Sequence, residues 1–76
     1  MVNYGAINPD ALSFALAFPD KIKFYRILLS KFKQYSEIAV KRCNHIVYSH
    51  GGQLVACICG VRNQNVITIY NTTRIR

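Results

Sequence analysis

Three cysteines and two histidines are the residues of this 76-residue chain whose types and spacing suit metal chemistry. Thiolates and imidazoles are the usual ligands of zinc, and Cys43-Asn44-His45 and Cys57-Ile58-Cys59 each place two of them on one face of an extended strand, with His50 nearby in sequence. Structural zinc sites generally draw on Cys-x-x-Cys turns, which this sequence lacks. We therefore expect no metal site and interpret the cysteines as reduced thiols that pack as small apolar groups.

Groups suited to catalysis are sparse. The three carboxylates, Asp10, Asp20 and Glu37, show no spacing that suggests a paired acid and base. Cys43 and His45 lie on an expected strand, which offers no cleft for a Cys–His nucleophile. The glycine pair before Gln53 lacks the lysine and the helix of a phosphate-binding loop. The sequence therefore predicts a protein that is not an enzyme and binds no cofactor.

Lys and Arg outnumber Asp and Glu ten to three, which gives a net charge of +7. This excess favours nucleic acid, anionic lipid or an acidic protein surface as a partner, although dispersed basic residues also serve to keep a surface soluble. Lys21, Lys23 and Tyr25 share one face of an expected strand and suit binding of phosphates and a stacked base. A small basic nucleic-acid-binding domain is therefore one alternative. In a sheet covered by a neighbour that face is not available, so no nucleic acid is expected there.

The hydrophobic pattern is mainly that of β-strands. In Leu12–Phe18, large apolar residues alternate with small ones, which predicts a strand with two nonpolar faces, in a sheet covered on both sides. Other strands are expected at Lys21–Tyr25, Ile46–Tyr48, Leu54–Cys59 and Val66–Tyr70. Turn residues at Pro19-Asp20, Ser49–Gly52 and Arg62–Asn65 separate them.

The two halves of the chain repeat. The strand that opens at Leu12 aligns with the one that opens at Leu54, and Ile22–Tyr25 aligns with Ile67–Tyr70. A period of about 40–45 residues with short strands and polar turns is typical of β-propeller blades. We predict an all-β fold, a propeller piece of about two blades over residues 1–76, with the strands of blade one within about 11–40 and those of blade two within about 43–71. Other all-β arrangements are the alternative. Because such a piece leaves sheets uncovered, further blades are expected in the same or another chain.

A helix is the second alternative for the middle of the chain. Ile22, Tyr25, Leu29 and Phe32 fall at helical spacing among basic residues, as in an amphipathic helix that binds a membrane surface or a calmodulin-like groove. Ser30 and the aromatic and β-branched content disfavour it. The longest apolar runs, 11–18 and 54–59, are far below the roughly 20 residues of a membrane span, so no membrane partner is expected.

Two phrases of the chain resemble a WD-repeat blade. They are Ser49–Ala56 (SHGGQLVA) and Asn65–Thr73 (NVITIYNTT). An earlier segment, with Asn8-Pro9 followed by Ala17–Phe24 (AFPDKIKF), also resembles this kind of repeat. More narrowly, the order and spacing from about Asn8 to Arg76 resemble the ciliary WD-repeat family of cilia- and flagella-associated protein 57. The chain departs from WD blades where Tyr25-Arg26 and Tyr70-Asn71 replace Trp-Asp. Asp20 occupies the turn where such blades often hold a buried aspartate.

The resemblance implies a scaffold in the cytoplasm and cytoskeleton, in the ciliary axoneme. The partners it implies are the tubulin doublet and components of the inner dynein arm or its regulatory complex, and an acidic microtubule surface suits the basic chain. Since propeller loops carry binding while strands carry the core, the expected contacts are turn residues: Lys21, Arg62, Asn63 and Gln64.

Overall fold

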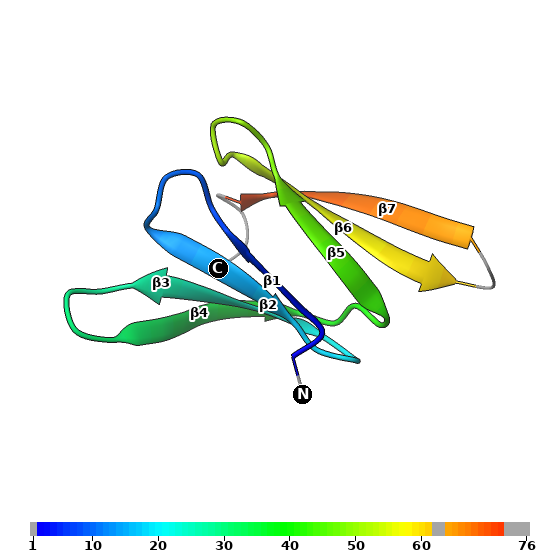
Figure 1. Ribbon diagram of the computed structural model, residues 1–76, viewed down its shortest axis with the longest axis horizontal. Helices are drawn as coiled ribbons and strands as arrows, with labels where there is room; N and C mark the ends of the chain where they lie inside the picture. The colour runs from blue at the N-terminus through cyan, green and yellow to red at the C-terminus, as the bar shows by residue number, and fades with distance from the viewer. Residues whose placement is uncertain (1, 62–63, 73–76) are drawn as a thin grey trace.

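The computed structural model describes residues 2–61 and 64–72, and this part of the chain forms two antiparallel sheets (Figure 1). Sheet A contains, in chain order, β1 (Tyr4–Ile7), β2 (Ser13–Ala17), β3 (Ile22–Ile27) and β4 (Phe32–Ile38). Sheet B contains β5 (Cys43–Tyr48), β6 (Leu54–Val61) and β7 (Gln64–Asn71). Every connection is a hairpin or short loop. The all-β class predicted from the sequence is confirmed for the described residues.

The alternative of a helix over Ile22–Phe32 is wrong. That segment forms β3, a turn and the start of β4, and the turn is closed by the Leu28 amide, which donates to the Lys31 carbonyl at 2.8 Å. Ile22 and Phe24 are fully buried on one face of β3. Burial at every second residue is the period of a strand, so packing against sheet B overrides the helical spacing.

Two strands escaped the sequence interpretation. β1 has a short, glycine-containing sequence (YGAI) that gives little signal. β4 is largely polar, and a register shift opposite Phe24 and Tyr25 breaks its alternation. Sheet A therefore begins at Tyr4, ahead of the region of about 11–40 in which its strands were expected.

The hydrophobic core lies between the two sheets. Sheet A contributes a flat strip of small residues, Ala15 and Ala17, flanked by the larger side chains of β3. Opposite them lie the inward side chains of sheet B. Among the described residues, the buried hydrophobic side chains are Ala15, Ala17, Ile22, Phe24, Cys43, Ile46, Val55, Cys57 and Cys59. Since the alanines carry nothing beyond Cβ, the sheets can approach closely at β2, and Phe24 fills the space beside it.

The first strands of the two sheets lie side by side (Figure 1). The rings of Tyr4 on β1 and His45 on β5 are 4.5 Å apart between centroids. At one end of this contact, the buried Asn8 side chain donates to the Gly52 carbonyl at 3.3 Å, and the Thr72 hydroxyl donates to the same oxygen at 2.7 Å. The Asn8–Gly52 hydrogen bond therefore joins the loops of the two sheets beside the apolar core, and Thr72 binds the same oxygen from within sheet B.

The first hairpin loops of the two sheets have the same backbone structure. In each, two amides donate to two carbonyls in the same pattern: Asn8 to Ser13 and Ala11 to Asn8 in sheet A, Ser49 to Leu54 and Gly52 to Ser49 in sheet B, all at 2.8–2.9 Å. Ala11 and Gly52 both have positive φ, at 61° and 76°. Equivalent residues are thus 41 apart, as are the contacting Tyr4 and His45. The alignment of Leu12 with Leu54 made from sequence is wrong by one residue.

The equivalence continues into the third strands. The Ile27 amide donates to the Leu12 carbonyl, and the Thr72 amide donates to the Gln53 carbonyl, each at 2.8 Å. Ile22 and Tyr25 therefore correspond to Ile67 and Tyr70, as the sequence alignment of this pair predicted. The repeat is real, and the longer β6–β7 hairpin accounts for its change in spacing.

Ala11 is strained by its positive φ, and Ala11→Gly is expected to stabilise the fold. The left-handed conformation costs an L residue about 1–2 kcal/mol, whereas glycine costs about 0.4–1 kcal/mol through the entropy of the unfolded chain. The difference predicts a rise of about 0.5–1 kcal/mol in the free energy of unfolding, measured by urea denaturation. Ala6→Gly within β1 is the control, and it should lower the same quantity.

Candidate functional site

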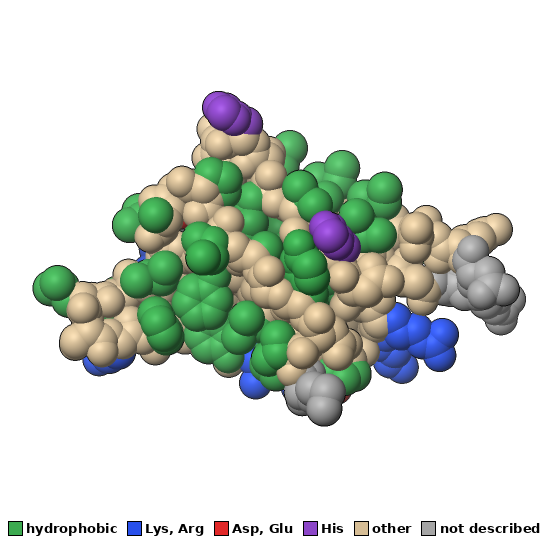
Figure 2. Space-filling model, in the orientation of Figure 1, with side chains coloured by type: hydrophobic (Ala, Val, Ile, Leu, Met, Phe, Trp, Pro, Cys, Tyr) green, Lys and Arg blue, Asp and Glu red, His purple; other side chains and the backbone are tan. Residues whose placement is uncertain are grey.

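Three basic side chains lie in two neighbouring connections at one end of the sheets. Lys21 is half-buried in the β2–β3 turn, and Lys41 and Arg42 are exposed in the β4–β5 connection. The two loops are joined by the Arg42 amide, which donates to the Pro19 carbonyl at 3.0 Å. We call Lys21, Lys41 and Arg42 the basic rim. Figure 2 shows Lys and Arg side chains along the lower border of the molecule.

The topology places the last residue of β6 and the first residue of β7 at this same end. In an antiparallel meander successive strands reverse direction, so the β2–β3 turn, the β4–β5 connection, the end of β6 and the start of β7 share one end (Figure 1). Of the contact residues predicted from sequence, Lys21 belongs to the rim and Gln64 is exposed at the start of β7, whereas Arg62 and Asn63 lie outside the described residues. Lys41 and Arg42 were missed, although the Lys-Arg pair before Cys43 is a visible signal. Asp20, expected at a position that is buried in WD blades, is exposed.

The outward side of sheet A carries a cluster of aromatic rings. Phe14 stacks on Tyr25 with centroids 5.1 Å apart, and Phe32 meets Phe14 edge-on at 5.2 Å. Ile7 and Phe32 are 70% and 66% exposed. We call this surface the aromatic face, composed of Ile7, Phe14, Leu16, Phe18, Tyr25 and Phe32. Its apolar character is typical of a surface that another part of a protein or a partner covers.

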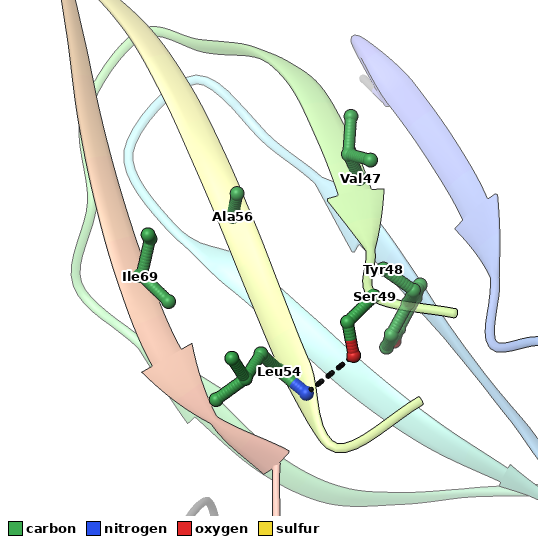
Figure 3. Close-up of a pocket in the computed structure, with 6 residues that line it drawn as sticks. All are labelled: Val47, Tyr48, Ser49, Leu54, Ala56 and Ile69. Carbon is green, nitrogen blue, oxygen red and sulfur yellow. Dashed lines mark hydrogen bonds between the residues drawn. The ribbon is translucent and has the colours of Figure 1, made fainter. Parts of the chain in front are cut away.

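The outward side of sheet B is aliphatic. Val47, Leu54, Ala56, Ile58, Ile67 and Ile69 form it by cross-strand pairing, and we call it the aliphatic face. Ile67 and Ile69 are 61% and 63% exposed. A shallow hollow of about 190 Å³ lies on this side (Figure 3), where the Leu54 amide donates to the Ser49 hydroxyl at 3.0 Å. The hollow is lined almost wholly by apolar atoms, so it suits an apolar side chain from outside.

The face proposed for nucleic acid is part of the aromatic face. Lys23 and Tyr25 do point to one side of β3, as predicted. However, the Lys23 ammonium lies over the Phe18 ring, 5.1 Å from its centroid, and one side of the Tyr25 ring is covered by Phe14. These groups are engaged within the chain, which leaves less of them for phosphates and bases.

The cysteines lie in the core and the histidines lie outside it. Cys43, Cys57 and Cys59 are buried, whereas His45 and His50 are exposed. The Cys43 thiol donates to the His45 carbonyl at 3.3 Å. Within residues 2–61 and 64–72, no group of three or more His, Cys, Asp or Glu side chains is arranged to hold a metal ion.

Burial changes the acidity of this core. It raises the pKa of Cys57 from 9.0 to about 12, with a smaller contribution from Cys43. Burial likewise raises the pKa values of Tyr35, Tyr48, Tyr70 and Cys59. A thiol that stays protonated is a poor nucleophile, which agrees with a packing role for the buried Cys57 and Cys59.

One curated relative is the mouse (Mus musculus) cilia- and flagella-associated protein 57. It is 29% identical to this chain over 70 residues, which is 92% of the chain and 5% of the mouse protein. The similarity supports a relation to that protein along nearly the whole chain. The chain spans only this small part of its relative.

Two other comparisons add no family. No protein-family model matches the sequence, and no solved structure matches the fold. Among the described residues there is also no helix of the length and apolar character needed to cross a membrane.

We predict that alkali destabilises the fold through Cys57. Its pKa is raised by folding, so the stabilisation is complete below pH 9, where the thiol is protonated in both states, and is lost as the pH rises toward 12. Between these limits the Cys57 contribution falls by up to about 1.4 kcal/mol per pH unit. Urea denaturation at fixed protein concentration from pH 8 to 11 measures it.

Cys57→Ala is the matched variant for this measurement. Burial, which is the largest cause of the raised pKa of Tyr48 and Tyr70, acts in both proteins, so the difference between the two curves contains the Cys57 thiol and its smaller effect on these tyrosines. The free energies of unfolding of the two proteins should converge as the pH rises, because alanine has no thiol to ionise. Parallel curves across the whole range would contradict the assignment.

Proposed function

We propose that this chain is a non-catalytic section of a WD-repeat-like β-propeller in a ciliary axonemal protein, where it presents surface to other proteins. Its proposed setting is the cytoskeleton of the cilium or flagellum. The relative's name associates that protein with cilia and flagella, and the similarity covers most of this chain. A relation of this kind makes an axonemal setting the first one to test.

The sense in which the sheets stack supports the propeller part of the proposal. Residues 41 apart are equivalent, so Ala15 corresponds to Ala56, and Ala15 faces sheet B while Ala56 faces away from sheet A. Two sheets related by a twofold axis would have equivalent residues facing one another. Here each sheet is oriented like the one before it, as in a radial array of blades.

The arrangement of first strands agrees with that array. β1 and β5 are the first strands of their sheets and lie side by side, with Tyr4 against its own equivalent, His45. In a propeller, the first strands gather around the central axis. The hydrogen-bonded aspartate of typical WD blades has no counterpart in the exposed Asp20, so the resemblance lies in stacking and repeat length.

The basic rim is the proposed contact with the axoneme. Gln64, at the start of β7, lies at the same end of the strands as this rim and belongs to the proposed contact. Arg62 and Asn63 are proposed as contacts from the sequence and lie outside the described residues. The supposed partners are the tubulin doublet and components of the inner dynein arm or its regulatory complex. An acidic tubulin surface would attract this rim, and loops held by a rigid sheet are suited to binding.

Binding to salt-washed axonemes tests this function. The double variant Lys21→Glu, Lys41→Glu is expected to weaken co-sedimentation of the chain about tenfold, because two reversed charges at a rim cost about 1.4 kcal/mol together. Lys31→Glu, Lys33→Glu is the control. It changes the net charge equally, but at the β3–β4 end of sheet A, and should stay close to the unsubstituted chain.

Three results would count against the proposal. They are failure of the tagged protein to remain with detergent-extracted axonemes, equal losses in the two double variants, and displacement by an RNA oligomer with a steep dependence on salt. The last result would assign the basic residues to phosphates, because release of counterions gives that slope.

A further inference from the structure

The aliphatic face of sheet B repeats a surface that is buried in sheet A. Ile67 and Ile69 occupy the positions of Ile22 and Phe24, both of which are 0% exposed under sheet B. Ala56 likewise occupies the position of the fully buried Ala15. The exposed face thus has the residue types and the strand positions of a surface that this protein covers with a sheet.

The aromatic face of sheet A repeats a covering surface. Phe14 and Leu16 occupy the positions of Val55 and Cys57, which bury sheet A from above. Tyr25 occupies the position of Tyr70, which packs against the same core. The aromatic face therefore has the character of the surface that covers Ile22 and Phe24, with larger side chains.

From these two equivalences we infer that a second copy of this chain covers the aliphatic face with its own aromatic face. The inference rests on the same-sense stacking of sheets in the proposed function and names the partner of one face. The new contact continues the contact between sheets A and B by one more step. Each copy offers one aliphatic and one aromatic face, so the interface is heterologous and the copies stack head to tail.

The charges of the two faces agree with this contact. The six residues of the aliphatic face include no Lys, Arg, Asp or Glu. Lys23 lies on the aromatic face, opposite Leu16 and with its ammonium over Phe18, at the position of Thr68, which is exposed although it is on the inward side of sheet B. A lysine at that position therefore keeps its ammonium in water when the sheet is covered.

Face-specific variants test the inference by sedimentation equilibrium. Ile67→Glu removes the aliphatic face, and Leu16→Glu removes the aromatic face with its carboxylate opposite Lys23. Each should raise the concentration for half-association by more than about tenfold. Ile67→Glu would bury a carboxylate without a partner, and Leu16→Glu replaces an apolar contact with a carboxylate that is attracted to Lys23 within its own chain. Thr68→Glu is the control on the same strand and opposite side, and should associate as the unsubstituted chain does.

Mixing the two face variants is the decisive step. Ile67→Glu retains an aromatic face and Leu16→Glu retains an aliphatic face, so an equal mixture should give a one-to-one heterodimer that grows no further. Circular dichroism checks that each variant keeps its sheets. Ile7→Glu, at a position 70% exposed, replaces Leu16→Glu if that variant unfolds.

Any of three results would overturn the inference. One is a chain that stays monomeric up to about 0.1 mM, a concentration at which even a weak specific contact is populated. Another is a mixture that forms no heterodimer. The third is association that neither face variant weakens, as pairing through the edges of β4 or β7 would give. A monomeric chain that still binds axonemes would leave the proposed function standing.

Discussion

The close approach of two sheets across a strip of alanine is the contact on which this structure depends. Ala15 and Ala17 give β2 a flat inward surface, and the side chains of Ile46 and Cys57 fill the other side. Burial of apolar area contributes about 25 cal/mol per Å², so a core of nine residues gives this small chain a modest stability. Since the core lies between the sheets, neither sheet has a core of its own.

That contact explains why only part of the fold was readable in the sequence. The strands that enter the core alternate large and small or polar residues, and β2, β3, β5, β6 and β7 were all expected close to where they lie. The described side chains of β1 and β4 that pack against the core, Tyr4, Ala6, Tyr35 and Ile38, are only partly buried, and their sequences show little alternation of large apolar and polar residues. The helical spacing around Tyr25 was a coincidence of the residues in β3, a turn and β4.

The repeat shows the same limit in finer detail. Ile22 and Ile67 were matched correctly because both open β-rich strands after a polar turn. Leu12 and Leu54 were matched because each is a large apolar residue at the start of an apolar run. The backbone hydrogen bonds show that Leu12 is instead equivalent to Gln53, one residue earlier. A shift of one residue in the alignment moves every side chain of a strand to the opposite face. The relative orientation of the two sheets can therefore be read only from the backbone hydrogen bonds. Lys41 and Arg42 joined the candidate site for a related reason, since only the fold brings the β4–β5 loop beside Pro19.

The link from Asn8 to Gly52 has a consequence for how the layers are held in place. Attraction between apolar surfaces has no preferred direction, so two smooth sheets can slide over one another with little change in energy. The Asn8 side chain crosses from one layer to the backbone of the next, and its oxygen accepts from the Asp10 amide at 3.0 Å, which holds the amide group in orientation. Gly52 has no side chain to obstruct this approach: a Cβ there would meet the Asn8 carboxamide. The Asn8–Gly52 hydrogen bond therefore opposes sliding of one sheet over the other along the strand direction. It fixes the relative position of two sheets that apolar contact alone would not fix.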